Sequence, residues 1–122
     1  MQSKLKIACL LLISSLNFLY CQVTPVSPSI GDGSQSNPYQ INVPGNLTWI
    51  GSNLGSAGNV YFIQTNDIDL TGIDWIPLPD FRGNYDGNGF EIQNMTINRP
   101  TINNNGLFAN ISWGAEVKNL GI

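Results

Sequence analysis

Short stretches of this chain alternate apolar and polar residues with the period of a β-strand. Two of them, residues 92–97 and 117–122, share one pattern position for position: apolar, polar, Asn, apolar, small, apolar. A looser copy at residues 66–70 precedes them at a slightly longer interval. Related strands at a near-constant spacing are typical of a solenoid, in which each repeat packs on its neighbour.

The asparagine inside each copy predicts a corner between two straight segments. Successive side chains of a strand point to opposite faces, so Ile92 and Met95 can share one face only where the chain bends at Asn94. Asparagine tolerates the left-handed backbone conformation of such a corner, and its amide can bond to the asparagine of the next coil. We therefore expect Asn66, Asn94 and Asn119 to form a stacked ladder.

Clusters of glycine and asparagine separate the copies and predict tight turns. Residues 83–89, Gly-Asn-Tyr-Asp-Gly-Asn-Gly, precede the second copy, and residues 103–106, Asn-Asn-Asn-Gly, precede the third. Asp-Gly and Asn-Gly pairs supply the positive φ angles that tight turns require. Both segments are therefore expected to be loops.

The chain before the copies has a different pattern. Residues 38–43 alternate as a strand does, and Leu47, Ile50 and Leu54 follow at the helical spacing of three and four. Gly51 weakens the tendency to form a helix at this place. We expect a short helix or helical turn that covers the open edge of the first coil.

Residues 1–21 have the zones of a secretory signal peptide. Lys4 and Lys6 give a positive start, and residues 7–20 form an apolar run shorter than the roughly 20 residues that a membrane-spanning helix needs. We therefore expect export and cleavage after Cys21, with no transmembrane span. Lipid attachment at Cys21 is the alternative, which Tyr20 disfavours because lipidation requires a small residue before the cysteine.

Composition favours a turn-rich β structure and argues against nucleic-acid binding. The chain has 11% charged residues and 13 Gly, and 15 Asn follow Gln22. Removal of the signal leaves three cations and eight acidic residues, a net charge of −5, which is a poor match to a phosphate backbone. Cys9 and Cys21 both lie in the signal, so the exported part has no disulfide.

Candidate catalytic chemistry is sparse. The sequence has no His, which excludes His-dependent triads and His-bearing zinc sites, and no cysteine nucleophile remains after cleavage. Asp67 and Asp69 lie two apart on a strand, with Cα atoms ~6.6 Å apart, within the range of paired acids in sugar hydrolysis. No Lys or Arg is near them in sequence, and so few coils give little groove for a polymer. We therefore expect no catalytic residues and no enzyme activity.

Two binding chemistries stay open as alternatives. Asp67, Asp69 and Asp74 could supply oxygen ligands for calcium, but the chain lacks the Asp-rich nonapeptide pattern of calcium-binding solenoids, so no metal or cofactor site is expected. Exposed aromatic rings could stack on sugars, although rings at such positions more often fill the core. The aromatic candidates are Trp49, Trp75, Trp113, Tyr39, Tyr61 and Tyr85.

Six segments of the chain, taken in order, resemble the GLUG-motif repeat proteins. They are Gly31-Asp32-Gly33-Ser34, Asn37-Pro38-Tyr39-Gln40-Ile41, Thr65-Asn66-Asp67-Ile68-Asp69-Leu70, Tyr85-Asp86-Gly87-Asn88-Gly89, Gly106-Leu107-Phe108 and Val117-Lys118-Asn119-Leu120-Gly121. The resemblance covers residues 31–122 and departs from the family at Ala109, where the motif usually has Gly. The family comprises secreted bacterial β-helix proteins, found as repeats in large surface adhesins and in immunoglobulin A-cleaving metallopeptidases.

Together, the repeats and the resemblance predict an all-β fold, a right-handed parallel β-helix (solenoid) of about three coils with a short capping segment. The expected division is a signal peptide at residues 1–21, a short linker at 22–30 and the N-terminal portion of a β-helix at 31–122. Family members normally run through more repeats, so we expect this chain to be truncated at its C-terminus and to belong to a longer polypeptide.

The resemblance implies a non-catalytic structural or adhesive module of a secreted or cell-surface bacterial protein. The alternative is a carbohydrate-binding or polysaccharide-degrading β-helix, either a hydrolase or a lyase. Surface glycans and host or cell-surface proteins are the candidate partners, and nucleic acid is not among them. The expected location is extracellular or on the outer cell surface, after cleavage near Cys21.

Overall fold

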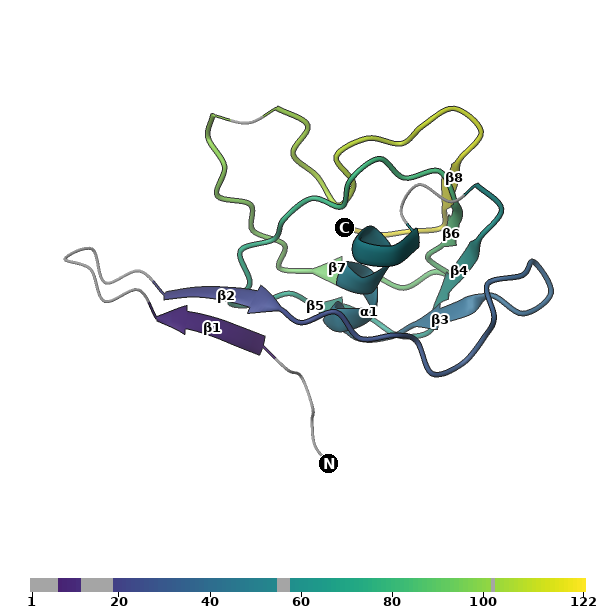
Figure 1. The fold of residues 1–122 in the computed structure, drawn as a ribbon, viewed down its shortest axis with the longest axis horizontal. Helices are drawn as coiled ribbons and strands as arrows, with labels where there is room; N and C mark the ends of the chain where they lie inside the picture. Colours follow the sequence, from purple (N-terminus) through teal and green to yellow (C-terminus); the bar gives the residue numbers. More distant parts are fainter. Residues whose placement is uncertain (1–6, 12–18, 55–57, 102) are drawn as a thin grey trace.

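The computed structural model describes residues 7–11, 19–54, 58–101 and 103–122 (Figure 1). Its elements, in chain order, are β1 (Ile7–Leu11), β2 (Leu19–Val23), β3 (Tyr39–Ile41), α1 (Pro44–Trp49), the π-helical turn η1 (Ile50–Leu54), β4 (Tyr61–Gln64), β5 (Ile68–Asp69), β6 (Asn84–Asp86), β7 (Ile92–Gln93) and β8 (Glu116–Lys118). Most of these elements are short strands and little helix is present, so the expected all-β class is confirmed.

The largest described sheet contains four parallel strands in the order β3-β4-β6-β8. Tyr39 pairs with Phe62, Phe62 with Tyr85, and Tyr85 with Val117. Long connections therefore join neighbouring strands, as parallel pairing requires. The strand expected at residues 38–43 is confirmed as β3. Figure 1 shows the four strands side by side, from β3 in blue to β8 in yellow.

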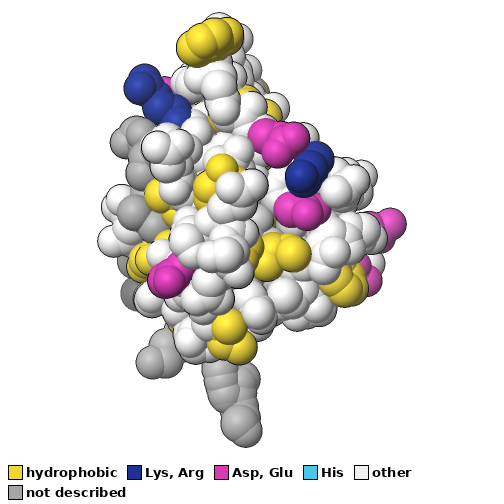
Figure 2. Space-filling view, turned by 90° about the vertical axis from the view of Figure 1, so that its right-hand side faces the viewer, with side chains coloured by type: hydrophobic (Ala, Val, Ile, Leu, Met, Phe, Trp, Pro, Cys, Tyr) yellow, Lys and Arg dark blue, Asp and Glu magenta, His cyan; other side chains and the backbone are white. Residues whose placement is uncertain are grey.

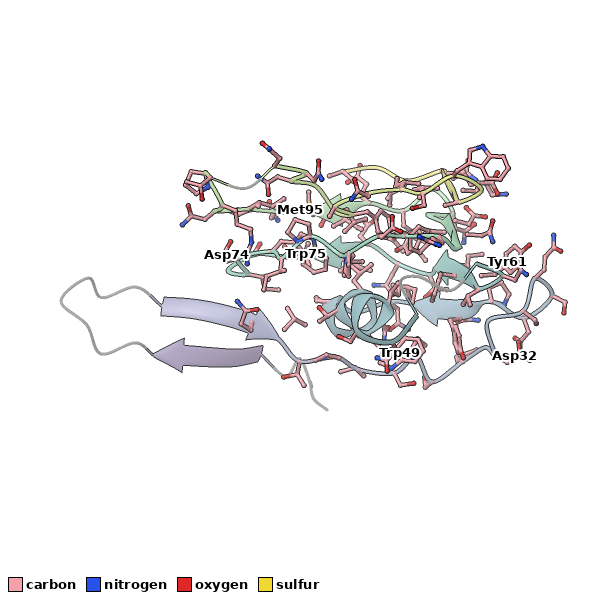
Figure 3. All side chains as sticks on the ribbon, turned by 45° about the horizontal axis from the view of Figure 1, so that its top comes forward. Asp32, Trp49, Tyr61, Asp74, Trp75 and Met95 are labelled. Atoms are coloured by element: carbon pink, nitrogen blue, oxygen red, sulfur yellow. The ribbon has the colours of Figure 1, made fainter. Side chains whose placement is uncertain are left out.

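A second parallel pair, β5 with β7, lies apart from the four-stranded sheet (Figure 1). Its register places Ile68 opposite Ile92. Isolated parallel bridges continue the pairing: Asp74 with Thr96, Leu78 with Phe108, Phe81 with Ile111, and Glu91 with Gly121. Successive layers of the chain are thus hydrogen-bonded to one another, and Figure 3 shows these layers stacked.

The core between the layers contains a column of aromatic rings. Ring centroids lie 5.9 Å apart for Tyr39 and Phe62, 6.0 Å for Phe62 and Phe81, and 4.4 Å for Phe81 and Phe108. Because each ring packs on a ring of the preceding layer, the column runs through the stack without interruption. Buried aliphatic residues complete the core, including Ile41, Leu47, Ile50, Ile68, Leu70 and Ile92.

The helix expected around Leu47 and Ile50 is confirmed by α1 and η1. Both side chains are fully buried, so the apolar positions of the helical pattern face the core. The Oδ1 atom of Asn46 accepts hydrogen bonds from the backbone N–H groups of Asn42, at 3.1 Å, and Val43, at 3.3 Å. These bonds fix the chain where it enters the helix.

The segment at residues 83–89, expected to be a loop, contains the strand β6. This strand lies between β4 and β8, and its central residue Tyr85 is 1% exposed. A buried residue between two outward-facing neighbours is enough for a short strand of period two. The expected turn is confirmed only after the strand, where Asn88 and Gly89 have φ angles of 54° and 82°. In the second expected loop, Asn104 also has a positive φ, of 62°.

The repeat found in the sequence does not describe the pairing of the strands. It aligns Val117 with Ile92, whereas the structure pairs Val117 with Tyr85 and Ile92 with Ile68. The two sequence copies therefore lie in different sheets, one in β7 and the other in β8. The connection between β7 and β8 is long and adds residues to one layer. The number of residues between similar motifs therefore differs from the number between paired strands.

The predicted asparagine ladder is also wrong. Nδ2 of Asn66 donates to the backbone oxygen of Asn42 at 3.0 Å. Nδ2 of Asn94 donates to Oδ1 of Asp69 at 2.9 Å, and Nδ2 of Asn119 donates to Oδ1 of Asp86 at 3.0 Å. The corner conformation is confirmed for Asn94 and Asn119, with φ angles of 58° and 55°, and not for Asn66. Each amide binds its layer to the preceding one, but the three bonds lie at different places in the stack.

β1 and β2 pair in antiparallel orientation; β1 lies in the segment expected to be a signal peptide, whereas β2 extends beyond it to Gln22 and Val23. Residues 1–6 and 12–18 of that segment lie outside the described residues. Val23, the last residue of β2, is 8% exposed and packs in the core. Cleavage after Cys21 stays a prediction, and the cut would fall just before this core residue. Neither of the helical elements described is long and apolar enough to cross a membrane.

Candidate functional site

A groove with a volume of about 330 Å³ lies on the outer face of the four-stranded sheet. Its floor consists of side chains that point away from the core on β4, β6 and β8. Figure 2 faces the side of the molecule where these strands lie and shows a basic side chain next to acidic ones, with hydrophobic side chains below them. The lining residues are Gln35, Pro38, Tyr61, Phe62, Ile63, Asn84, Tyr85, Asp86, Glu116 and Lys118.

Strand alternation and parallel register build the first column of the groove. On β4, Phe62 is buried, whereas Tyr61 and Ile63 are half-buried and face outward. Tyr61 pairs with Asn84, and Asn84 pairs with Glu116. An aromatic ring, an amide and a carboxylate therefore follow one another across three strands. Figure 3 shows the Tyr61 side chain at the edge of the molecule, directed away from the interior.

A second column runs beside the first and consists of Ile63, Asp86 and Lys118. The Oδ1 atom of Asp86 accepts hydrogen bonds from the backbone N–H of Asn88, at 2.8 Å, and from Nδ2 of Asn119, at 3.0 Å. One oxygen of this carboxylate is therefore held by the chain. These two hydrogen bonds hold the Asp86 carboxylate in one position at the groove.

The charges of the groove are nearly balanced. The Nζ atom of Lys118 lies 3.6 Å from Oε1 of Glu116, and the two side chains are 50% and 57% exposed. Together with Asp86 they give the groove one positive and two negative groups. An ion pair this exposed contributes little to stability. Either group can therefore leave the pair and bind a ligand at a small cost in free energy.

Two polar groups of the groove have no protein partner within the described part of the chain. The hydroxyl of Tyr61 and the side-chain amide of Asn84 make no hydrogen bond there. Both residues are half-buried, and both line the groove. The groove therefore offers one ring face, one amide and one hydroxyl for contact with a ligand, next to the charged groups.

The two acids that the sequence singled out lie outside this groove. The Oδ1 atom of Asp67 accepts a hydrogen bond of 2.8 Å from the backbone N–H of Glu91. The Oδ1 atom of Asp69 accepts bonds from the backbone N–H and the hydroxyl of Thr71, at 3.0 and 2.6 Å, and from Nδ2 of Asn94, at 2.9 Å. Each carboxylate thus binds groups of the fold and joins its own layer to the next.

Hydrogen bonds favour the ionised form of two aspartates, the exposed Asp69 and the half-buried Asp80. Donors around Asp69, foremost the Asn94 amide, lower the pKa of that carboxyl below its usual range. The hydroxyl of Ser112 lowers the pKa of Asp80 in the same way, followed by Arg82, whose Nε lies 2.9 Å from Oδ2. Both carboxylates are therefore charged and hydrogen-bonded at neutral pH.

Asp74, the third expected calcium ligand, accepts a 3.0 Å hydrogen bond from the backbone N–H of Asn98. It lines a second cavity of about 310 Å³, which lies between η1 and residues 73–79. Trp75 and Val23 contribute to its mainly apolar walls, so part of the cavity is formed by β2. Among the residues that the structure describes, no group of three or more His, Cys, Asp or Glu could hold a metal ion.

The aromatic candidates divide into core residues and exposed residues. Four pack in or against the core, as expected: Tyr39, Trp49, Trp75 and Tyr85. The remaining two differ, because Tyr61 lines the groove whereas Trp113 is fully exposed at the surface. Tyr61 is therefore the aromatic candidate that combines partial exposure with a concave setting.

The sequence analysis did not assign the charged and amide residues of the groove, Asn84, Asp86, Glu116 and Lys118, to a binding site. Asn84 and Asp86 lay in a segment expected to be a turn, Lys118 appeared only as a polar position of the repeat copy at residues 117–122, and Glu116 lay outside the quoted motifs. Their common signal is the alternation of outward polar residues with an inward-facing centre, which is buried in β6 and half-buried in β8. That signal does not tell which strands become neighbours, so it could not assemble the groove.

Comparison with known proteins gives two relatives, and the match covers only a small part of each relative. No family model and no solved structure match the chain. It is 35% identical over 102 residues to a protein described as a Gly-rich membrane protein from Evansella cellulosilytica, a match that covers 75% of the chain and 12% of the relative. It is 31% identical over 99 residues to halomucin from Haloquadratum walsbyi, covering 74% of the chain and 1% of the relative. The chain thus spans a small part of each relative.

Proposed function

We propose that the chain is a non-catalytic structural or adhesive module of a secreted or cell-surface protein, built as the N-terminal portion of a right-handed parallel β-helix. The order β3-β4-β6-β8 and the pair β5-β7 support this architecture, because both join segments that lie one layer apart. Crossovers between parallel strands are right-handed with few exceptions. In this arrangement α1 covers the first layer and prevents its edge from pairing with another chain.

The resemblance to GLUG-motif repeat proteins supports the same proposal. Proteins of that family are secreted by bacteria and include large adhesins, and the expected signal peptide at residues 1–21 fits export. The names of the two relatives, a membrane protein and a halomucin, agree with a place at the cell surface. Surface glycans or proteins of neighbouring cells are the partners that such a module would meet.

The hydrogen bonds that aspartates accept from the next layer are the observation that best supports a structural role. Five aspartate carboxylates accept a hydrogen bond from a residue 24 to 33 positions later in the chain: Asp67 from Glu91, Asp69 from Asn94, Asp74 from Asn98, Asp80 from Ser112, and Asp86 from Asn119. Hydrogen bonds to charged groups are stronger than neutral ones. These carboxylates therefore connect successive layers, which is what a rigid spacer or scaffold requires.

Surface labelling of the native cells tests the proposal. An antibody raised against residues 22–122 is applied to intact cells before and after treatment with an external protease. We expect labelling of intact cells and its loss after proteolysis. Labelling that requires lysis of the cells would contradict the proposal. Incubation of the exported protein with polysaccharides should release no reducing ends.

A polysaccharide-degrading β-helix is the second candidate, favoured by two carboxylates in the groove. Asp86 and Glu116 are diagonal neighbours on adjacent parallel strands, which places their Cα atoms roughly 8 Å apart, similar to the separation of the two carboxyl groups in inverting glycosidases. However, Asp86 already accepts two hydrogen bonds and Glu116 lies beside Lys118. We favour binding without cleavage, and the release of reducing ends would decide for the second candidate.

A further inference from the structure

We propose that the groove over β4, β6 and β8 binds an uncharged glycan, with the ring of Tyr61 packed against a sugar and Asn84 and Asp86 bonded to its hydroxyl groups. The proposal rests on the proposed adhesive role and names the class of ligand that this role would use. It assigns the site to the sheet face, where Asp86 lines the groove; the other four aspartates that connect the layers do not line it.

The aromatic contribution comes from Tyr61. A sugar ring presents C–H groups on its faces, and an aromatic ring is a suitable partner because it is flat and apolar with a negative face. Tyr61 is half-buried, points away from the core and makes no ring contact with another aromatic residue in the described structure. Ile63 lies two residues along the same strand and extends the apolar surface next to the ring.

The polar contribution comes from groups that are held in place before a ligand arrives. Asn84 lies on a central strand and has an amide without a partner among the described residues, so it can both donate to and accept from a hydroxyl group. Asp86 has one oxygen fixed by Asn88 and Asn119, and carboxylates are strong acceptors for hydroxyl donors. A polyol matches this combination because each of its hydroxyls is at once a donor and an acceptor.

The charge of the groove selects among glycans. Asp86 and Glu116 outnumber Lys118, so the groove is slightly negative, and the exported chain carries a net charge of −5. An anionic polymer such as a polyuronate would be repelled by both the groove and the whole surface. An uncharged glycan avoids this repulsion and keeps the contacts with the ring and the amide.

The two columns of the groove also suit a chain-like ligand. Neighbouring strands lie ~4.8 Å apart, a distance close to the length of one sugar unit in an extended chain. Tyr61, Asn84 and Glu116 occupy successive strands at that spacing, and Ile63, Asp86 and Lys118 repeat it beside them. A glycan lying across the strands can therefore contact each strand with a successive sugar.

Isothermal titration of the exported full-length protein tests the proposal. The probes are cellohexaose, xylohexaose, mannohexaose and chitohexaose as uncharged glycans, and hexagalacturonate as the anionic one. We expect at least one uncharged hexaose to bind, and Tyr61→Ala to weaken its binding about tenfold. Asn84→Ala should also weaken it, and Tyr61→Phe should leave most of the affinity because the ring remains.

The matched control is Trp113→Ala, which removes a fully exposed aromatic ring outside the groove. We expect it to leave binding unchanged, and thermal unfolding of every variant checks that the fold is kept. Binding that depends on Trp113 and not on Tyr61 or Asn84 would overturn the proposal. Binding of hexagalacturonate alone, or of none of the probes, would overturn it as well.

Failure of the groove and failure of the adhesive role give different results. Surface labelling of cells without binding of any hexaose would remove the groove proposal and leave the adhesive role standing. Binding of a hexaose at Tyr61 followed by its cleavage would keep the groove and replace the non-catalytic role by hydrolysis or elimination.

Discussion

The carboxylate of Asp69 and the amide of Asn94 are joined by a hydrogen bond of 2.9 Å across two layers of the chain. Asn94 has a φ angle of 58°, so the same residue turns the backbone and connects it to the layer before. Asp69 also binds the backbone N–H and the hydroxyl of Thr71. One exposed contact thus combines a corner of the chain with a bond between layers.

We predict that removing either partner of this contact lowers the stability of the protein. Asn94→Ala and Asp69→Ala should each lower the midpoint of urea unfolding, and the double variant should lose less than the sum of the two losses because they share one interaction. The matched control is Asn59→Ala, an exposed asparagine, which should leave the midpoint unchanged. Strict additivity of the two losses would show that the bond contributes nothing in solution.

We predict that stability falls at acid pH because three aspartates have lowered pKa values. The side chain and backbone of Ser34 lower the pKa of Asp32, and the donors described above lower those of Asp69 and Asp80. The unfolded chain therefore takes up protons at a higher pH than the folded one. The contribution of these groups is complete above their unfolded pKa of about 3.9 and is lost as the pH falls through the lower folded values.

Urea unfolding at pH values from 7 to 2 measures this loss. The midpoint should change little between pH 7 and 5 on account of these three groups and should decrease below pH 4. A variant with Asp32→Asn, Asp69→Asn and Asp80→Asn should be less stable at pH 7 and should show a smaller decrease. An equal decrease in the variant would assign the acid sensitivity to other carboxylates.

We predict that Tyr85→Phe destabilises the fold through a buried polar contact. The hydroxyl of Tyr85 donates to Oε1 of Gln64 at 2.8 Å, and both residues are at most 1% exposed. Burial raises the pKa of Tyr85, so the hydroxyl stays protonated and remains a donor. Its removal leaves a buried acceptor without a partner, at a cost of about 1–3 kcal/mol. Tyr61→Phe, which removes a hydroxyl at the surface groove, is the control and should cost little.

The sequence predicted local structure but not the pairing of distant strands. Leu47 and Ile50 predicted their helix because helical spacing is a local property of the chain. The pairing of Val117 with Tyr85 could not be predicted, because it depends on the lengths of the loops in between. The groove shares that dependence, since Tyr61, Asn84 and Glu116 become neighbours only through the register of three strands.

The sequence was also misleading where a segment with turn-forming residues contains a strand. Gly-Asn-Tyr-Asp-Gly carries the chemistry of a turn, yet burial of Tyr85 in the core makes its centre a strand. Burial of a single aromatic ring can outweigh local turn preference, because the intrinsic preferences of short strands are weak and depend on context. The copies around Asn94 and Asn119 share a corner conformation without sharing a sheet.

Gly31→Ala should destabilise the protein more than any other single glycine-to-alanine change at a loop of the first layer. Gly31 has a φ of 97°, and a Cβ atom there would collide with the backbone carbonyl of Pro38. The neighbouring backbone is fully engaged, because the N–H of Gln40 donates to the oxygen of Ile30 at 3.0 Å and the N–H of Tyr61 donates to that of Gly33 at 2.9 Å. The loop therefore cannot move aside without breaking bonds to β3 and β4.

The expected loss is about 2 kcal/mol or more, since an alanine at positive φ costs about 1–2 kcal/mol before any collision is counted. The control is Gly58→Ala, where a Cβ atom meets nothing within 4 Å. Urea unfolding compares the two variants. Because Pro38 lines the groove, Gly31→Ala should also weaken binding of an uncharged hexaose while Gly58→Ala should not. Equal stability of the two variants would mean that the loop can shift, and the close approach of Pro38 would then not constrain it.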